Sequence, residues 1–181
     1  MRLRGGDAQD SATVCVIRLL PDGRPDPGFS RDGVALVDHG YGNDSAEAVV
    51  LRGGKVIVAG DGREADGSRF GLARLRGDGR LDRSFGRRGH RLVSFGARRL
   101  ATAYALTAAP GGRIVAVGGA VVEGRQPQFA IARLGRRGRL ERRVRTGTGD
   151  DTAEAIALTP GHATIAGSIS SSHGLARYLT R

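Results

Sequence analysis

Several residue types that often define a function are scarce in this chain. Cys15 is the only cysteine among 181 residues, which excludes an internal disulfide framework and a metal cluster built from cysteines. There is no tryptophan, and aromatic residues make up 4% of the chain, so the stacking residues on which single-strand nucleic-acid binders depend are few. No apolar run approaches the roughly 20 residues of a membrane-spanning helix. The opening MRLRGGDAQD is polar and lacks the apolar stretch of a signal peptide. We therefore expect neither a membrane span nor a signal peptide in this chain.

Lysine is almost absent as well, yet the chain is strongly basic. Lys55 is the only lysine among 29 basic residues, which stand against 18 acidic ones and give a formal net charge of +11. Such a balance is typical of proteins that bind nucleic acid or another polyanion. It is equally compatible with an arginine-rich surface that is only solvated, and both interpretations stay open.

Glycine, in contrast, is abundant at 30 positions and accompanies an internal repeat. VIVAG at residues 56–60 recurs as IVAVG at 114–118 and ATIAG at 163–167. FGLARL at 70–75 recurs as FAIARL at 129–134 and HGLARY at 173–178, with VCVIRL at 14–19 as an earlier copy. The spacing drifts by single residues between the full copies, and the last copy is abbreviated. Such drift is typical of a structural repeat with insertions in its loops.

Each copy contains four short apolar runs separated by Gly, Asp and Pro. In the first full copy they cover residues 34–37, 46–51, 56–59 and 70–75. Their length and β-branched content predict strands, while the glycine density and the lack of a sustained 3.6-residue period disfavour helices. Four strands per repeat are typical of a propeller blade or a β-solenoid coil. The sequence therefore predicts an all-β, propeller-like array of about three four-stranded antiparallel repeats. We expect it to be open or partial, because closed propellers use about 4–8 blades.

The repeats suggest a simple domain organisation. We expect a polar N-terminal segment over residues 1–13 and a single β-repeat array over residues 14–181. Within the array, the sequence predicts an orphan strand at 14–20 and repeats at about 33–85, 89–144 and 145–181. Unpaired strand edges of an open array favour self-association with another chain.

The combination of VIVAG, FGLARL and DGRLDRSFG (residues 78–86) at this period resembles the delta-60 repeat family of bacterial β-propeller-like proteins. The resemblance covers about residues 14–179. It implies a propeller-like fold and a secreted or cell-surface protein, since members are often parts of large proteins of that kind. The family has no defined catalytic or binding residues, so none are carried over.

One arginine recurs inside an apolar strand of every copy: Arg18, Arg74, Arg133 and Arg177. An acid follows the first three after eight residues: Asp26, Asp82 and Glu141. A guanidinium pairs well with a carboxylate, and an unpaired buried charge is costly. These residues therefore predict structural ion pairs, with an anion site as the alternative; Arg177 has no such acid after it. The glycines that end the VIVAG-like strands are expected to permit a left-handed turn or close approach of the next blade: Gly60, Gly118 and Gly167.

Residues for catalysis or metal binding do not follow the repeat. The four histidines occupy four different repeat positions, without the spacing of metal ligands, and we expect them at the surface or in turns: His39, His90, His162 and His173. An acid pair recurs in two copies, but the middle copy has Ala101 and Tyr104 in its place. The sequence thus predicts no catalytic, cofactor-binding or metal-binding residues.

We therefore expect a non-catalytic structural or interaction module, serving adhesion or scaffolding in a larger assembly, with an unknown protein or an anionic polymer as partner. One alternative is a polyanion-binding protein. Alternate loops of an up-and-down blade emerge on the same rim, which predicts one basic rim and one acidic rim. Four arginines of the predicted inter-blade segment are the candidate anion-binding residues: Arg136, Arg137, Arg142 and Arg143. A propeller-type hydrolase or lactonase is the remaining alternative.

Overall fold

The computed structural model describes residues 13–39, 44–96, 100–121, 126–146, 149–169 and 172–179. Apart from a 3₁₀ turn at Pro110–Gly112, the regular elements in these ranges are β-strands. In chain order they are β1 (Val14–Ile17), β2 (Val34–Val37), β3 (Ala48–Arg52), β4 (Lys55–Glu64), β5 (Gly67–Leu75), β6 (His90–Val93), β7 (Leu100–Ala109), β8 (Arg113–Val121), β9 (Gln128–Leu134), β10 (Leu140–Thr146), β11 (Asp151–Thr159), β12 (His162–Ile169) and β13 (Ser172–Leu179). Within these ranges no helix is long and apolar enough to span a membrane. The predicted all-β fold is confirmed.

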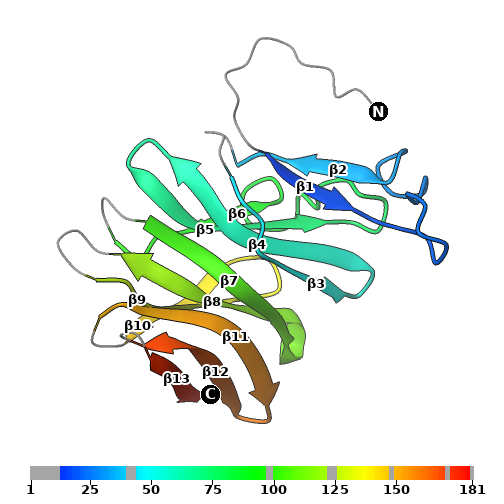
Figure 1. Ribbon diagram of the computed structural model, residues 1–181. Helices are drawn as coiled ribbons and strands as arrows, with labels where there is room; N and C mark the ends of the chain where they lie inside the picture. The colour runs from blue at the N-terminus through cyan, green and yellow to red at the C-terminus, as the bar shows by residue number, and fades with distance from the viewer. Residues whose placement is uncertain are drawn as a thin grey trace.

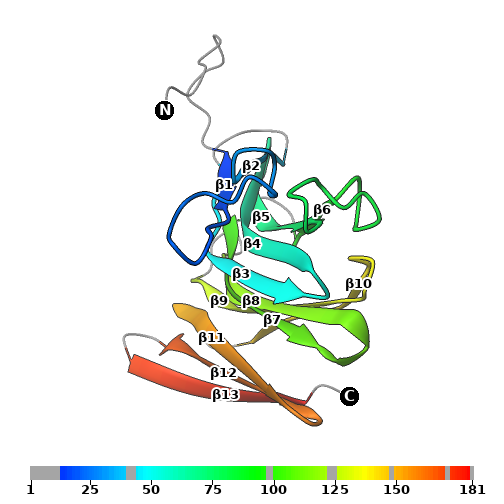
Figure 2. The ribbon, with the colours of Figure 1, turned by 90° about the vertical axis from the view of Figure 1, so that its right-hand side faces the viewer.

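The strands form four antiparallel sheets, each a simple meander. Two are four-stranded, β3-β4-β5-β6 and β7-β8-β9-β10; β1-β2 precedes them and β11-β12-β13 follows them. The sheets succeed one another in chain order (Figures 1 and 2), and β7 contacts both β3 and β11, the first strands of the neighbouring sheets. In the part of the chain that the structure describes, no sheet closes on itself. The predicted open, propeller-like array is therefore confirmed, with two complete blades between two incomplete ones.

Apolar side chains fill the space between each sheet and the next. Phe29 and Val58 belong to the cluster between β1-β2 and the first blade, and Leu72 and Ile114 to the cluster between the two complete blades. A third cluster, which includes Ile165, lies between the second blade and β11-β13. Both faces of the complete blades are therefore buried, which explains why the strands at 56–59, 70–75, 114–118 and 129–134 are nearly continuous apolar runs.

The sheets are out of phase with the predicted repeat boundaries. The strand at 34–37, expected to begin the first full repeat, instead pairs with the strand at 14–17. The latter is therefore not an orphan strand. His90–Val93 likewise pairs with β5 and completes the preceding sheet. The blades consequently cover residues 48–93 and 100–146, rather than 33–85 and 89–144, and the last sheet covers 151–179 rather than 145–181. A repeated sequence shows the length of the repeat but not the strand at which a blade begins, because the repeat length is the same whichever strand is taken as the first. Residues 1–12 of the predicted polar segment lie outside the described residues.

The recurring glycines lie in β4, β8 and β12, each the second strand of its sheet. At these glycines the backbone of the first strand of the same sheet, or of the segment leading into it, approaches most closely. A Cβ at Gly60 would overlap the carbonyl oxygen of Ser45, and one at Gly118 would overlap that of Thr102. Gly167 has the same relation to Thr152. The register of β7-β8 shifts between Ala103 and Ala105, beside Gly118, as expected of a β-bulge. The close approach thus comes from the same sheet, not from the next blade, and the backbone at these glycines is not left-handed.

Candidate functional site

The repeated strand arginines lie within ion-pair distance of the acids that follow them by eight residues. The Nε to carboxylate oxygen distances are 2.8 Å for Arg18–Asp26, 2.9 Å for Arg74–Asp82 and 3.3 Å for Arg133–Glu141. Arg74 and Asp82 form the most buried of the three pairs, each side chain being 8% exposed. Arg177 belongs to β13, and its side chain lies outside the described residues.

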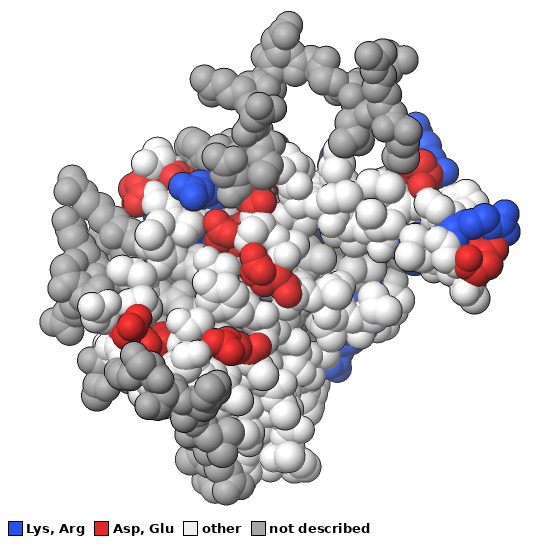
Figure 3. Space-filling model, in the orientation of Figure 1, with Lys and Arg blue, Asp and Glu red and all other residues white. Residues whose placement is uncertain are grey.

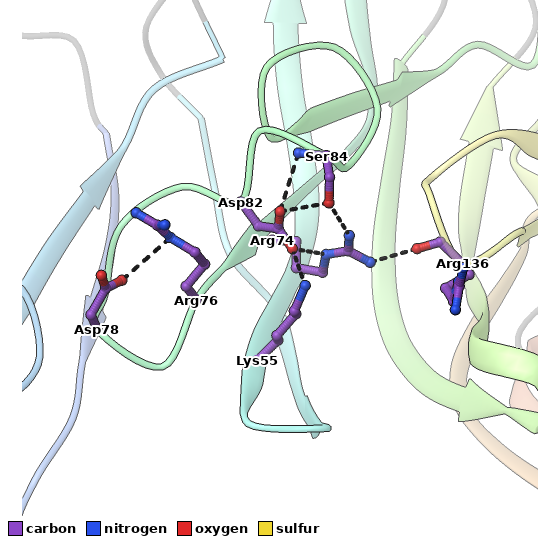
Figure 4. A network of polar contacts seen from close by, with 7 residues as sticks. All are labelled: Lys55, Arg74, Arg76, Asp78, Asp82, Ser84 and Arg136. Carbon is purple, nitrogen blue, oxygen red and sulfur yellow. Dashed lines mark hydrogen bonds and ion pairs between the residues drawn. The ribbon is translucent and has the colours of Figure 1, made fainter.

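Two of these arginines also bridge to the next sheet. Arg18 Nη1 donates to the carbonyl of Gly77 at 2.5 Å, and Arg74 Nη1 donates to the carbonyl of Arg136 at 2.5 Å (Figure 4). Gly77 and Arg136 occupy the same repeat position, 59 residues apart. Each guanidinium thus holds the turn of its own sheet and the equivalent turn of the following sheet. The eight-residue spacing gave no signal of this second contact, because its acceptor is a backbone carbonyl far away in sequence.

The same repeat positions add further contacts between sheets. Ser30 N–H donates to the Asp78 carbonyl at 2.9 Å, and Gly86 N–H donates to the Arg137 carbonyl at 2.8 Å. The guanidinium carbons of the first two arginines lie over aromatic rings, 4.8 Å from the Phe29 centroid and 4.7 Å from the Phe85 centroid. A guanidinium over a ring face is attracted by the ring quadrupole. The arginines therefore act as inter-blade connectors.

In each of the two complete blades, a second cation lies within ion-pair distance of the acid that pairs with the strand arginine. Lys55 Nζ lies 2.5 Å from Asp82 Oδ2, and Arg113 Nε lies 3.1 Å from Glu141 Oε2. Burial by itself would raise the pKa of the Asp82 carboxyl. Hydrogen bonds from Lys55 and Ser84 outweigh this effect, and the pKa of Asp82 falls well below its ordinary value. The carboxylate therefore stays ionised throughout the physiological range.

A pocket of about 360 Å³ lies at the same end of the two complete blades, and we call it the first inter-blade pocket. Five basic residues line it: Arg52, Lys55, Arg74, Arg136 and Arg137. The first three come from the first blade and the last two from the β9-β10 turn of the second blade. The structure thus gathers two of the four candidate anion-binding arginines with three cations of the neighbouring blade.

A related pocket of about 570 Å³ lies between the second blade and β11-β13, and we call it the second inter-blade pocket. Arg113 and Arg133 line it, in the repeat positions of Lys55 and Arg74. Ala109 stands where the first pocket has Arg52, and the β11-β13 sheet contributes residues 158–161, which carry no charge. The two pockets therefore share a location in the repeat but differ in charge.

Arg142 and Arg143 lie elsewhere. They belong to the outermost strand β10, where Arg142 is opposite Arg133 and Arg143 is opposite Ala132. Arg143 Nη1 donates to the carbonyl of Ser94. The expected inter-blade loop is shorter than predicted because β10 pairs with β9 from Leu140 onwards. These two arginines are therefore strand residues outside the pocket lining.

Charge is unevenly distributed over the surface. Acidic side chains are scattered over the face shown in Figure 3, while most of the basic side chains visible there lie along its right-hand margin. The β3-β4, β5-β6, β7-β8 and β9-β10 connections emerge at one end of the blades, since successive strands of a meander alternate in direction. We call this end the basic rim, defined by Arg52, Lys55, Arg80, Arg113, Arg136 and Arg137.

Two histidines form a contact that was not predicted from the sequence. His39 after β2 and His90 in β6 contact each other edge to face, with ring centroids 5.1 Å apart. Burial, the largest effect, lowers the pKa of both rings, against the opposing charge of Asp44. The two residues occupy different repeat positions, so nothing in the sequence placed them together. Among the described residues, no three His, Cys, Asp or Glu side chains gather as a metal site would require.

Residues 54–85 match a protein-family model described as a domain of unknown function (DUF5122) beta-propeller. The matched segment runs from the β3-β4 turn to the turn that carries Asp82, and it includes Arg74. No curated protein matches the chain. Over those residues the chain is similar to this β-propeller family, and its sheets form β-propeller-like repeats.

Proposed function

We propose that this propeller module is a non-catalytic interaction module of the delta-60 repeat type, serving adhesion or scaffolding within a larger assembly. The basic rim is its binding surface, and the partner carries negative charge. One observation carries the proposal: Arg52, Arg136 and Arg137 meet at one pocket of this rim, and none of them forms an ion pair with a described residue. Clefts lined by charge of one sign concentrate the opposite charge near them.

An anionic polymer is the partner that this arrangement favours. The cations of the rim come from the adjacent turns of both complete blades, with Arg52 and Lys55 on one and Arg113, Arg136 and Arg137 on the other, so a polymer with several charges can contact more than one of them. Such binding is electrostatic, releases counterions and weakens steeply with salt. A hydrolase or lactonase reaction has no comparable support among the described residues, since Asp82 and Glu141, the acids beside the two inter-blade pockets, are engaged in ion pairs with arginine or lysine.

Retention on immobilised heparin tests the proposal. The variant Arg136→Gln/Arg137→Gln removes two charges from the basic rim. The control Arg63→Gln/Arg145→Gln removes two exposed charges near the opposite ends of β4 and β10. We expect the rim variant to elute at lower salt than both the wild type and the control, with unchanged circular dichroism. Equal elution of the two variants would overturn the rim as the binding surface.

A further inference from the structure

The first inter-blade pocket carries a large excess of positive charge. Its five basic residues are accompanied by one carboxylate in contact with them, that of Asp82, which is shared by Lys55 and Arg74. Arg52 Nη1 donates to the carbonyl of Ala109 at 2.6 Å, which fixes the side chain without neutralising it. Arg136 and Arg137 are exposed and contribute only backbone carbonyls to the contacts between blades. The excess therefore resides on three guanidinium groups that are available to a ligand.

The buried arginine of the pocket has each of its three guanidinium nitrogens engaged in a hydrogen bond. Arg74 uses Nε on Asp82, Nη1 on the Arg136 carbonyl and Nη2 on Ser84 Oγ at 3.1 Å. It adds to the positive potential of the pocket without offering a free donor in these directions. A ligand would thus be bound by the arginines at the mouth and attracted by the charges at the base.

We propose that the first inter-blade pocket binds a single tetrahedral oxyanion group, a phosphate or sulfate ester, of the anionic polymer. This proposal rests on the proposed function and assigns its recognition site. Guanidinium groups match the geometry of phosphate and sulfate oxygens and can bind them in bidentate fashion. The volume of about 360 Å³ lies near the lower end of the range for small-molecule pockets and leaves room for such a group.

Two glycines help to keep the pocket open. Gly53 and Gly112 line it without side chains, and both have positive φ, +55° and +76°. A Cβ at Gly112 would lie 2.9 Å from Cγ of Arg136, so a larger residue would displace that arginine. Glycine at this turn therefore serves both the backbone conformation and the placement of Arg136.

The second inter-blade pocket is an internal comparison. It has Ala109 instead of Arg52, and its two arginines share Glu141. The part of its lining that comes from the β11-β13 sheet, residues 158–161, is uncharged. The repeat positions are the same, but the uncompensated guanidinium groups of the first pocket have no equivalents among its lining residues. Oxyanion binding is accordingly assigned to the first pocket alone.

The repeat itself supplies conservative variants for the test. Arg52→Ala introduces the residue type found at the same position of the next blade. Arg136→Gly/Arg137→Asp introduces the residue types that the preceding copy has at these positions, in Gly77 and Asp78. Those two residues make the same backbone contacts between sheets as Arg136 and Arg137 do. Arg136→Gly removes a positive charge and Arg137→Asp reverses one, while the backbone contacts at both positions are of a kind that the fold already accommodates. Arg52→Ala removes a positive charge together with the hydrogen bond to the Ala109 carbonyl, so its circular dichroism and melting temperature are measured beside its binding.

Isothermal titration calorimetry with inorganic phosphate and, separately, inorganic sulfate measures the site in the full chain. We expect Arg52→Ala and Arg136→Gly/Arg137→Asp each to weaken binding by at least about tenfold, as loss of a charge-assisted contact does. The control Arg63→Ala should stay within about twofold. Competition with polyphosphate and with heparin then shows whether the site prefers a phosphate or a sulfate group of a polymer. Binding by the wild type that is no tighter than binding by Arg52→Ala would overturn the pocket proposal. If Arg136→Gln/Arg137→Gln nevertheless loses heparin retention, the basic rim still binds polyanions and only the pocket is refuted.

Discussion

Replacement of Arg74 by alanine removes the most connected side chain of the interface between the two complete blades. Its guanidinium pairs with Asp82 at 2.9 Å, donates to the Arg136 carbonyl at 2.5 Å and to Ser84 Oγ at 3.1 Å, and lies 4.7 Å from the Phe85 ring centroid. The side chain is 8% exposed, so solvent screens these interactions little. By contrast, Arg76 lies 3.6 Å from Asp78, and both side chains are about half exposed.

The expected cost follows from what remains after the substitution. A buried ion pair that loses one member typically costs about 3–5 kcal/mol. Lys55 stays 2.5 Å from Asp82 and continues to neutralise it, which favours the lower end, about 3 kcal/mol. Arg76→Ala loses only a solvent-exposed pair, and we expect a cost under about 0.5 kcal/mol. Arg74→Lys retains the charge but not the fork of donors, so its stability should be intermediate.

Thermal unfolding followed by circular dichroism separates these variants. For a chain of this size, about 3 kcal/mol corresponds to a fall in Tm of about 6–12 °C. Arg76→Ala should melt within about 2 °C of the wild type on the same scale. Equal melting temperatures for Arg74→Ala and Arg76→Ala would refute the assignment of Arg74 as an inter-blade connector.

Three further predictions follow from other parts of the fold. Gly118→Ala should destabilise the fold by about 1–3 kcal/mol in urea denaturation, because its Cβ would overlap the Thr102 carbonyl. Gly119→Ala is the control and should cost much less, since the nearest atom to a Cβ at Gly119 is 3.4 Å away. Similar losses of stability in the two variants would exclude the bulge as the reason for glycine at position 118. Because burial lowers the pKa of His39 and His90 below the ordinary 6.5, the unfolded chain binds more protons than the folded one as the pH falls below about 6.5, so stability should decline there. His39→Gln/His90→Gln should flatten that decline, and a decline of unchanged slope would show that other groups cause it. Self-association through open strand edges predicts a sedimentation coefficient that rises over the micromolar range. Among the described residues β1 has a strand on one side only, and the β1-β2 sheet exposes Ile17 and Leu36. A constant monomer value would contradict this prediction.

The features that could be predicted from the sequence are those that depend on residues close together in the chain. Apolar runs bounded by glycine predicted the strands, and the eight-residue spacing of Arg74 and Asp82 indicated a contact that a strand and its following turn bring about locally. The blade boundaries could not be predicted in this way. The strand at 34–37 pairs with the strand before it, and only tertiary pairing distinguishes that choice from the opposite one.

The contacts between blades could not be predicted from the sequence for a related reason. The acceptor for Arg74 in the next sheet is the backbone carbonyl of Arg136, and every residue has such a carbonyl whatever its side chain. His39 and His90 come from unrelated repeat positions, so no periodicity could bring them together. The grouping of Arg52 with Arg136 depends in the same way on how two blades pack, which neither residue encodes in its local sequence.

These contacts separate the connectors Arg18 and Arg74 from Arg136 and Arg137, while Arg52 belongs to both groups because it donates to the Ala109 carbonyl of the second blade. The connectors use buried or half-buried guanidinium groups, Arg18 and Arg74, and on the opposite side only main-chain carbonyls. Because the acceptor is backbone, the side chain at that position can be Gly77 in one copy and Arg136 in the next with the same contact retained. Charge can therefore be added to the rim of one blade without a change in the interface beneath it. Arg136 and Arg137 of the first inter-blade pocket occupy such positions, so substitution of these two side chains should alter binding while the contacts of Arg74 are retained.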